Sequence, residues 1–587
     1  MRSRYFQLLL LLVLATSASA QTVNGLPRWT TPAERALIPE YRATRATATN
    51  GITTPPPHAV RTMAEWEEID YLCVTWTQYI PTVREIVRNA VDETNVLIIC
   101  SDSNQVITDL NNNNIALNRV RFLEAPFNSI WIRDYGANTT YKEEVDSLKL
   151  VEWIYNRPRP LDDAIPDAVA ADLGLLLYST VAAPYDLVHT GGNFHTDGFG
   201  TAFSSDLILD ENGLGGQYNI TIKGEAMIDS IMQLYMGIDR YIKMPELTFD
   251  IISHVDMHWR LLDEETLLVG EFPTGLSDGP QIEANLQYVL NNFNSVWGTP
   301  YRVVRVPMPP SANGNYAPQA YYRTYTNSVF VNKTLLVPIY RPQYDTTALR
   351  IMRESLPGYN VVGIDCNQII AAAGALHCIT RAVGVQEPLL IAHQRLRDTY
   401  DTQNDYRVDA WIKHISGIDS ATLWWTTDTT QGYQASPMAL TNASTDTWTG
   451  FIPAQSVGSQ IFYYVEAKAI SGKRQVRPLP APASYWDFSV LTTVASDPAQ
   501  NETWRLDPVF PNPARAITCI PVQSPFNSSG KIRLRDGMGR EMQVIHEGPI
   551  PAGTSRYFFF ADQLAAGFYL VELEGELGRS VQKVLVE

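Results

Sequence analysis

The chain has 587 residues, of which 45% are hydrophobic and 18% are charged. This length exceeds what one hydrophobic core can organise and predicts about three or four domains. The formal net charge of −17 excludes a general nucleic-acid-binding protein, because such binding depends on clustered basic side chains that neutralise phosphates. An acidic surface is compatible with cationic substrates.

The first residues have the pattern of an export signal. Arg2 and Arg4 precede an apolar run from Leu8 to Ala15, and Ala18-Ser19-Ala20 follows. A basic flank, a short apolar core and an Ala-x-Ala ending are typical of a secretory signal peptide, so we expect residues 1–20 to be removed on export. The run is too short for a membrane anchor, and no transmembrane segment is expected in the mature chain.

Composition and periodicity divide the rest of the chain. Residues 21–58 are polar and rich in Thr, Ala and Pro, which predicts a flexible leader or pro-segment. Residues 59–386 alternate between helical and strand patterns and are predicted to form an α/β domain. Its clearest elements are a helix over 80–93 and short buried strands over 96–100 and 120–123.

The following region, residues 387–494, reads as β throughout. Alternating segments near 406–412, 421–425 and 461–467 are separated by turn signals, and this layout favours an immunoglobulin-like sandwich. Residues 495–502 read as a linker. The last block, 503–587, again shows short strands with Gly turns and predicts a small β-domain.

The cysteines are few and odd in number. There are five, so at least one thiol stays unpaired within a monomer, which is unlike a disulfide-stapled exported protein. Cys378 follows the small residues 371–375, which would let backbone and substrate approach closely. A buried, inert cysteine is the alternative. Cys366 follows an apolar strand and lacks this setting.

The segment 254–259, His-Val-Asp-Met-His-Trp, admits three interpretations. If it is a strand, alternate side chains share a face, so His254, Asp256 and His258 could lie together. They could be core polar groups with local partners, or ligands of zinc or iron. Alternatively, His254 could be an acid/base with Asp256 as its carboxylate partner.

Two further segments contain charged residues in settings that could belong to a site. In 131–136, Trp-Ile-Arg-Asp-Tyr-Gly, an Arg-Asp pair stands between aromatic residues and could be a structural ion pair or part of a site. Arg157 and Arg159 are separated by a proline and lie close to acidic residues. They could belong to a solvated loop, or form a rigid clamp for a carboxylate.

Together these groups suit the hydrolysis of a guanidinium. Carboxylates would hold the planar cation, a thiolate would attack its carbon, and a histidine would protonate the departing ammonia and then activate water. Asp134 and Asp256, Cys378 and His254 supply this set without a metal or another cofactor.

At these residues the sequence resembles the bacterial, Porphyromonas-type peptidylarginine deiminases, relatives of the agmatine deiminases in the guanidine-modifying (pentein) superfamily. The resemblance spans about residues 63 to 384 and rests on five motifs, 131–136, 189–194 with 197–200, 254–256, 325–328 and 374–380. It implies an α/β propeller of five blades, independent of calcium.

By the same resemblance, Cys378 is the nucleophile, His254 the acid/base, and Asp134 and Asp256 the guanidinium ligands. Asn327 is a supporting polar group and Trp131 a wall of the pocket. The family's arginine pair, matched here by Arg157 and Arg159, implies recognition of the α-carboxylate of a C-terminal arginine. Agmatine has no carboxylate for such a clamp, so peptidyl-arginine is favoured over agmatine or free arginine.

The last block resembles the C-terminal sorting domain of the type IX secretion system. The matching segments are 508–514, 534–540, 564–571 and 582–586. With the signal peptide, this implies export through the type IX machinery, followed by release or attachment at the outer cell surface.

The expected protein is therefore an exported hydrolase that converts arginine, in peptides or proteins, to citrulline. One rival is a metal-dependent hydrolase that uses His254, Asp256 and His258. A second is a surface-binding protein whose propeller has lost activity.

Overall fold

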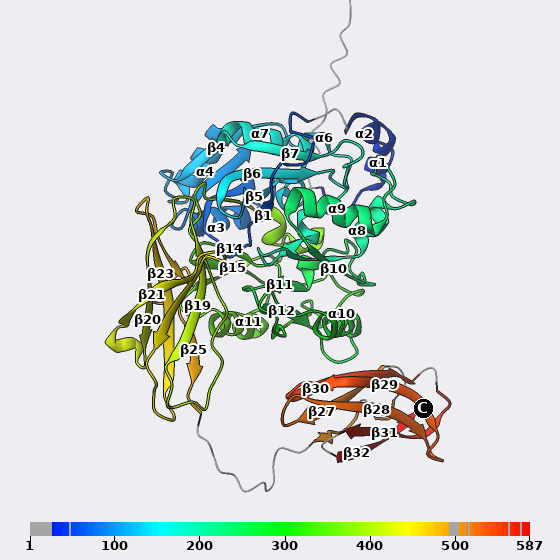
Figure 1. Ribbon diagram of the computed structural model, residues 1–587. Coiled ribbons are helices and arrows are strands. Elements are labelled where there is room, and N and C mark those ends of the chain that lie inside the picture. Colours follow the sequence, from blue (N-terminus) through cyan, green and yellow to red (C-terminus); the bar gives the residue numbers. More distant parts are fainter. Residues whose placement is uncertain are drawn as a thin grey trace, which may run out of the picture.

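The computed structural model describes residues 26–45, 49–491, 504–510, 512–514, 517–561, 564–575 and 578–586. The signal peptide predicted for residues 1–20 and the linker predicted for 495–502 lie outside the described residues. Figure 1 shows a mixed α/β unit, a long β unit beside it and a separate small β unit that carries the C-terminus.

The α/β unit, Val60 to Gly384, is built from five small sheets. The first joins β1 (Val60–Thr62), β5 (Asn138–Lys142), β6 (Asp146–Trp153) and β7 (Leu176–Thr180); the second β8 (His195–Thr196), β9 (Thr201–Ser205) and β10 (Arg240–Met244); the third β11 (Trp259–Leu261), β12 (Thr266–Glu271) and β13 (Arg302–Pro307); the fourth β14 (Val329–Val331), β15 (Thr334–Ile339) and β16 (Asn360–Asp365); the fifth β17 (Arg381–Gly384), β2 (Ile69–Thr75), β3 (Asn95–Cys100) and β4 (Val120–Glu124).

Each sheet repeats one unit of structure. An antiparallel pair is followed by a helix and a strand parallel to the second member of the pair. The connecting helices are α7 (Ile165–Leu173), α9 (Glu225–Met236), α10 (Gly279–Asn292), α11 (Pro342–Ser355) and α3 (Ile80–Ala90), with α4 (Ser103–Asn112) leading to β4. In the fifth sheet the antiparallel pair is β17 with β2, so the end of the unit closes onto its beginning.

The local sequence explains these elements and bears out the predicted ones. In α3, Val83, Ile86, Val87 and Ala90 recur at helical spacing and are buried, and a proline stands in the first turn, where its missing N–H costs nothing. Strand β3 is apolar and almost wholly buried, as expected for a parallel strand covered on both faces.

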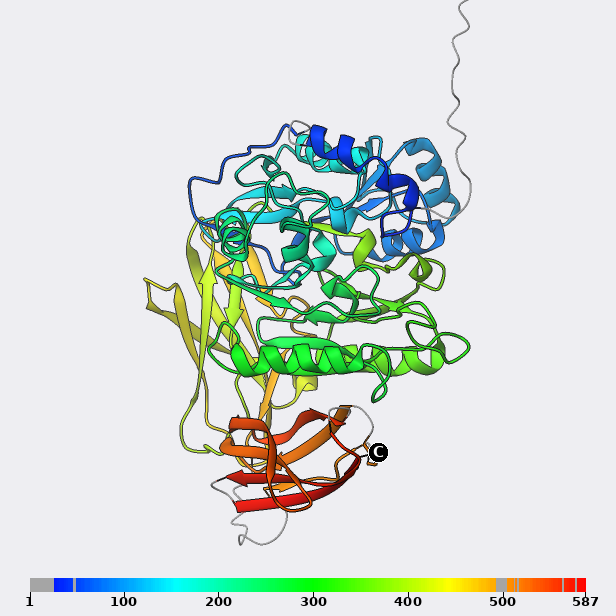
Figure 2. The ribbon, with the colours of Figure 1, turned by 90° about the vertical axis from the view of Figure 1, so that its right-hand side faces the viewer.

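The segment before the α/β unit differs from expectation. Instead of a flexible leader, residues 26–45 contain α1 (Pro32–Arg35) and α2 (Ile38–Arg45), drawn in dark blue on the outside of the α/β unit in Figures 1 and 2. Arg45 is buried and pairs with Glu152 and Asp163 at 3.1 Å each. A polar sequence is ordered here because its charges find buried partners, which composition does not reveal.

The β unit from Leu390 to Ser489 confirms the strands expected there. Its sheet runs β18 (Leu390–His393), β19 (Tyr406–Lys413), β22 (Thr447–Ile452), β21 (Gln434–Asn442), β20 (Ile418–Thr426), β23 (Gln460–Ala469) and β24 (Arg474–Arg477), and β25 (Trp486–Ser489) also pairs with β23. It has a hydrophobic core of its own. Polar contacts tie it to the α/β unit: Arg477 donates to the Trp66 carbonyl at 3.2 Å and pairs with Glu264 at 3.3 Å.

The last unit consists of two sheets around a third core. One contains β26 (Arg505–Leu506), β27 (Ile517–Ser524) and β30 (Gly553–Phe560), and the other β29 (Glu541–Ile550), β28 (Ser528–Asp536), β31 (Gly567–Gly575) and β32 (Gly578–Val586). All five cysteines of the chain lie in described parts, and each is a buried free thiol. In the described parts of the chain, every helix is too short or too polar to cross a membrane.

We expect Arg477→Ala to lower the free energy of unfolding by about 3 kcal/mol, because it leaves the buried Glu264 carboxylate without its cation. Arg474→Ala, on the same strand, is the matched control. Its side chain is 63% exposed and pairs with Glu466 at the surface, so the cost should stay below about 1 kcal/mol. Urea unfolding of both variants measures the difference, and equal losses would show that Arg477 does not tie the two units together.

Candidate active site

The predicted residues of the guanidinium site lie in short turns, each of which comes directly before the first strand of one repeat, whereas Arg157 and Arg159 lie between β6 and α6 (Pro160–Asp163). Asp134 is in α5 (Ile132–Tyr135), followed by β5, and Asp256 is in η2 (Val255–Met257), followed by β11. Cys378 is in η4 (His377–Ile379), followed by β17. Asn327 lies in the turn before β14, and η1 (Gly191–Asn193) comes before β8. Because equivalent turns of five repeats meet, residues about 250 positions apart in sequence share one site.

A guanidinium from within the chain fills this site. Arg28 donates from Nε and Nη2 to the two oxygens of Asp134 at 2.8 and 2.9 Å, a bidentate pair. Its Nη1 and Nη2 donate to the two oxygens of Asp256 at 3.3 and 3.2 Å. Nη1 also donates to Cys378 Sγ at 2.8 Å. The site therefore binds a planar cation between two carboxylates and a sulfur atom.

Burial makes these charges depend on one another. Arg28 and Asp256 are fully buried, and Asp134 is 1% exposed. Burial works to raise the pKa of each carboxyl group. Arg28 and His254 together hold the pKa of Asp134 below its ordinary value, and Arg28, His377 and His254 do the same for Asp256. The two carboxylates in turn keep the pKa of Arg28 above that of a free arginine, against the effect of burial.

The thiol of Cys378 faces the same cation. Gly374 lies against it, and a Cβ at that position would stand 3.0 Å from Sγ and 2.5 Å from the Trp131 ring. Asn327 Nδ2 donates to Sγ at 3.2 Å, and Asn327 Oδ1 accepts from the His377 backbone N–H at 3.0 Å. Burial raises the pKa of the Cys378 thiol, and the positive charge of Arg28 opposes that rise. The carboxylates of Asp256 and Asp134 add to the rise, so the pKa of this thiol stays well above its ordinary value.

His254 approaches the guanidinium from another side. Its Nε2 is 3.0 Å from the Thr190 hydroxyl, while its Nδ1 has no hydrogen-bond partner and lies 3.7 Å from an Asp134 oxygen. A Cβ on Gly192 would stand 1.6 Å from Arg28 Nη2 and 2.8 Å from His254 Nδ1, so the two nitrogens flank this glycine. Burial, together with the charge of Arg28, lowers the pKa of His254 to about 3. The imidazole is therefore neutral, with one nitrogen free to exchange a proton.

The strand assumed for residues 254–259 was wrong, because residues 255–257 form the 3₁₀ turn η2. His254 and Asp256 nevertheless reach the same guanidinium. His258 is buried, and neither of its ring nitrogens has a hydrogen-bond partner. A metal centre made of His254, Asp256 and His258 does not form, since the Asp256 carboxylate is bound to Arg28 and His377.

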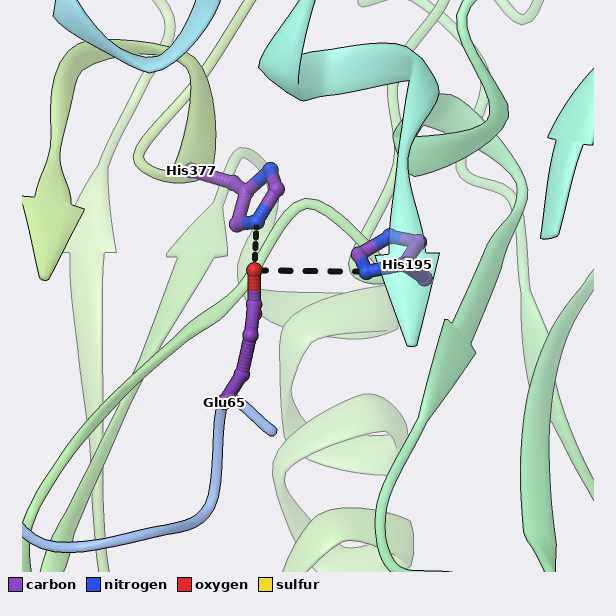
Figure 3. Close-up of side chains that lie close together, drawn as sticks. All are labelled: Glu65, His195 and His377. Atoms are coloured by element: carbon purple, nitrogen blue, oxygen red, sulfur yellow. Dashed lines mark hydrogen bonds and ion pairs between the residues drawn. The ribbon is translucent and has the colours of Figure 1, made fainter. Parts of the chain in front are cut away.

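In the described part of the chain, one group of side chains could hold a metal ion by its spacing. It consists of Glu65, His195 and His377, whose possible ligand atoms lie within 4.8 Å of one another. Figure 3 shows one oxygen of Glu65 facing both histidines, 2.7 Å from His377 Nε2 and 4.0 Å from His195 Nδ1. Arg133 and Arg260 bind the same carboxylate at 2.9 and 2.7 Å. Two cations already satisfy this carboxylate, so the group does not fit a metal ion.

The contacts of Glu65 and His377 instead fix the position of the Asp256 carboxylate. His377 Nδ1 lies 2.9 Å from Asp256 Oδ2, so Glu65, His377 and Asp256 form a continuous chain of hydrogen bonds. An imidazole held between two carboxylates keeps one orientation, and it holds Asp256 in place beneath the guanidinium.

The remaining predicted residues contact the main chain that carries Arg28. Arg157 Nε donates to the Arg28 carbonyl at 2.6 Å, and the Arg28 N–H donates to the Ala372 carbonyl at 3.1 Å. Arg159 Nη2 donates to the Pro27 carbonyl at 2.8 Å. Trp131 Nε1 donates to the Leu26 carbonyl at 2.7 Å. The site thus holds the peptide backbone of an arginine as well as its side chain.

An open cavity of about 650 Å³ adjoins this backbone. Trp29 and Arg157 line it, as do the acidic residues Asp210, Glu211 and Glu246. It offers space for chemical groups next to the arginine.

Three residues of the candidate site could not be identified from the sequence. Glu65 stands in a stretch without a recognisable motif, and its role follows from contacts with residues 195 and 377. His377 lies within the motif 374–380, beside Cys378, but nothing in the sequence was a reason to assign it a role. Arg28 could not be told apart from the other arginines of its segment, because nothing local marks the one that reaches the site.

Comparison with known proteins agrees with this geometry. Residues 61–383 match the model of the Porphyromonas-type peptidyl-arginine deiminase family, so the chain belongs to that family. It is a guanidino-group deiminase, a hydrolase that acts on guanidino C–N bonds. Residues 508–587 match a secretion system C-terminal sorting domain, which indicates type IX secretion to the cell surface or beyond it.

Individual relatives are distant. A putative agmatine deiminase of Vibrio parahaemolyticus is 26% identical over 298 residues, 45% of this chain and 78% of its own. One from Mycoplasma capricolum is 24% identical over 301 residues, 46% of this chain and 79% of its own. A structure of the agmatine deiminase of Enterococcus faecalis, at 17% identity and a TM-score of 0.50, covers 58% of this chain and 100% of that one, and it shares the fold.

Gly192→Ala should remove guanidinium binding, because the added methyl group would overlap Arg28 Nη2. The parent for this test is the Arg28→Ala chain, in which Arg28 no longer fills the guanidinium position. Ammonia release from an arginine peptide should fall by at least ~100-fold. Gly224→Ala is the control, since its Cβ would meet nothing within 4 Å. Unchanged release by the Gly192 variant would show that substrate does not occupy the position of the Arg28 guanidinium.

Proposed function

We propose that this deiminase acts on peptide-borne arginine and converts it to citrulline and ammonia. One observation carries the proposal: Arg28, an arginine within a peptide chain, fits the site with its guanidinium on Asp134 and Asp256 and its backbone on Arg157 and Ala372. Agmatine has neither a carbonyl nor an amide N–H at the corresponding positions, so it would leave these contacts unused.

In the first half of the proposed reaction, Cys378 is the nucleophile. Neutral His254 takes up the thiol proton, and Sγ forms a bond to the guanidinium carbon Cζ. His254 then gives this proton to the leaving nitrogen, for which Nη2 is best placed, and the Cζ–Nη2 bond breaks. Ammonia leaves, and a positively charged thiouronium remains on Cys378 between the two carboxylates.

In the second half, water replaces the sulfur. His254 removes a proton from water, and the oxygen bonds to Cζ as the Sγ–Cζ bond breaks. The product is the urea group of citrulline. The released proton and ammonia together form ammonium, and the thiol is restored. Asp134 and Asp256 stabilise the cation throughout, and Asn327 supports the sulfur.

Among peptide substrates, we favour those that end in arginine. One oxygen of an α-carboxylate would stand where the Arg28 carbonyl stands, 2.6 Å from Arg157 Nε. A carboxylate strengthens this hydrogen bond because both partners are then charged. Arg159 contacts the preceding carbonyl, so it would recognise the residue before the arginine.

The proposal includes the architecture and the export route expected from the sequence. We infer that the five repeats of the α/β unit form a five-bladed propeller around the site, since each contributes one turn to it. The β unit that follows would be an immunoglobulin-like sandwich. A signal peptide would start export, and the sorting domain would bring the chain to the type IX machinery.

Cys378→Ala in the Arg28→Ala parent should lose citrulline formation from a peptide ending in arginine, by at least ~10⁴-fold, because no other group can form the covalent intermediate. Cys366→Ala is the matched control, since this thiol is equally buried but does not contact the guanidinium. Colorimetric citrulline assay and mass spectrometry of the peptide, which gains about one dalton on conversion, measure the change. Equal rates for the two variants would favour a binding protein or another nucleophile.

Arg157→Ala should raise KM for a peptide ending in arginine by about 10- to 100-fold, the effect of losing a charge-assisted hydrogen bond. For agmatine, which lacks the carboxylate, KM should change by less than about 3-fold. Steady-state kinetics on both substrates in the Arg28→Ala parent give the comparison. A similar rise for both substrates would remove the argument for a C-terminal arginine.

A further inference from the structure

The guanidinium site is already occupied in the intact chain. Arg28, Asp256, His254 and Cys378 are each 0% exposed. An external arginine needs the same carboxylate oxygens and the same sulfur atom that Arg28 contacts. Substrate and Arg28 therefore exclude one another.

The segment that carries Arg28 is attached to the α/β unit over its whole described length. Glu34 pairs with Arg159 at 2.6 Å and completes a capping box with Thr31 at the start of α1. The Tyr41 hydroxyl donates to the Tyr155 carbonyl at 2.8 Å. Arg45 is held by Glu152 and Asp163. These contacts lie outside the guanidinium site, so the fit of the segment does not depend on Arg28 alone.

Attachment to the same chain gives Arg28 an advantage over any free substrate. A tethered group has an effective concentration in the millimolar range or above, whereas KM values commonly lie between about 1 µM and 1 mM. Anchors on both α1 and α2 restrict the segment further. Added substrate at ordinary concentrations would compete poorly.

The position of the sulfur favours an inhibitor over a substrate. Cys378 Sγ accepts a hydrogen bond from Nη1 at 2.8 Å, so in this arrangement the sulfur contacts an N–H of the guanidinium. Attack on Cζ requires the sulfur to stand above the plane of the cation. Two anchored helices hold the backbone of Arg28 in this arrangement.

We propose that residues 26–45 are an inhibitory segment that keeps the enzyme latent by placing Arg28 in the guanidinium site. Displacement or removal of the segment opens the site to substrate. An exported enzyme of this kind would leave the arginines of its own cell unmodified. The inference rests on the proposed function for its activity readout, but the occupancy of the site can be tested without it.

The test compares the wild-type chain with Arg28→Ala and with Arg42→Ala, which removes an exposed charge from the same segment. Two quantities are measured: citrulline formed from a peptide ending in arginine, and the rate at which iodoacetamide alkylates Cys378, followed by peptide mapping. Arg28→Ala should raise both by at least ~10-fold, and Arg42→Ala should match wild type.

The outcomes separate the two proposals. Faster alkylation without citrulline formation would support the inhibitory segment and overturn the proposed action on peptides that end in arginine. Equal citrulline formation by the wild-type and Arg28→Ala chains would overturn latency and leave the function standing. Conversion of Arg28 itself to citrulline during the assay, seen as a gain of about one dalton in its peptide, would show a substrate and also overturn latency.

A second variant tests the inhibitory segment in case the Arg28→Ala chain does not fold. Glu34→Ala removes the pair with Arg159 and the capping box but leaves every guanidinium contact in place. Loss of a helix cap and an ion pair should loosen the segment and raise citrulline formation about 3- to 10-fold. No rise in this variant, with Cys378 alkylation also unchanged, would count against the segment as the inhibitor.

Discussion

The site depends on a buried planar cation held by two buried carboxylates. The cation and the carboxylates stabilise one another, because a lone charge in this position would lose its hydration without compensation. Asp134 presents two oxygens to two nitrogens of the guanidinium, and Asp256 presents two more. This geometry matches a guanidinium and not an ammonium, whose point charge cannot form the same pattern. The positive charge of the same cation opposes the rise that burial causes in the pKa of the Cys378 thiol.

The repeated architecture explains how distant residues reach this cation. Each repeat of the α/β unit begins with a turn that lies ahead of its first strand, and the side chains that contact the Arg28 guanidinium sit on these turns. Strands and helices remain apolar and supply the core, while the turns are free to carry charge. The closing pair of β17 with β2 fixes the two ends of the unit together, which holds Cys378 against residues from the other repeats.

Recognition and inhibition use one set of contacts. The groups that would bind the backbone of a substrate, Arg157 and the Ala372 carbonyl, bind the backbone of Arg28. Under the proposed function the site holds peptide-borne arginine, and such a site is blocked most simply by an arginine of its own chain. The anchors of α1 and α2 then decide whether the block persists, because they set how often the segment leaves.

The sequence by itself singled out the residues that surround the guanidinium. Cys378, His254, Asp134 and Asp256 were predicted because a guanidinium demands those residue types, and the structure brings all four to the guanidinium of Arg28. The positions of elements such as α3 and β3 followed from apolar periodicity. Only the tertiary structure decided three other points: that residues 255–257 form a turn, that Glu65 and His377 position Asp256, and that Arg28 fills the site. The reason is physical. Residue type and local spacing report on intrinsic reactivity and periodicity, whereas the partner of a buried charge is set by contacts between residues that the sequence separates by hundreds of positions.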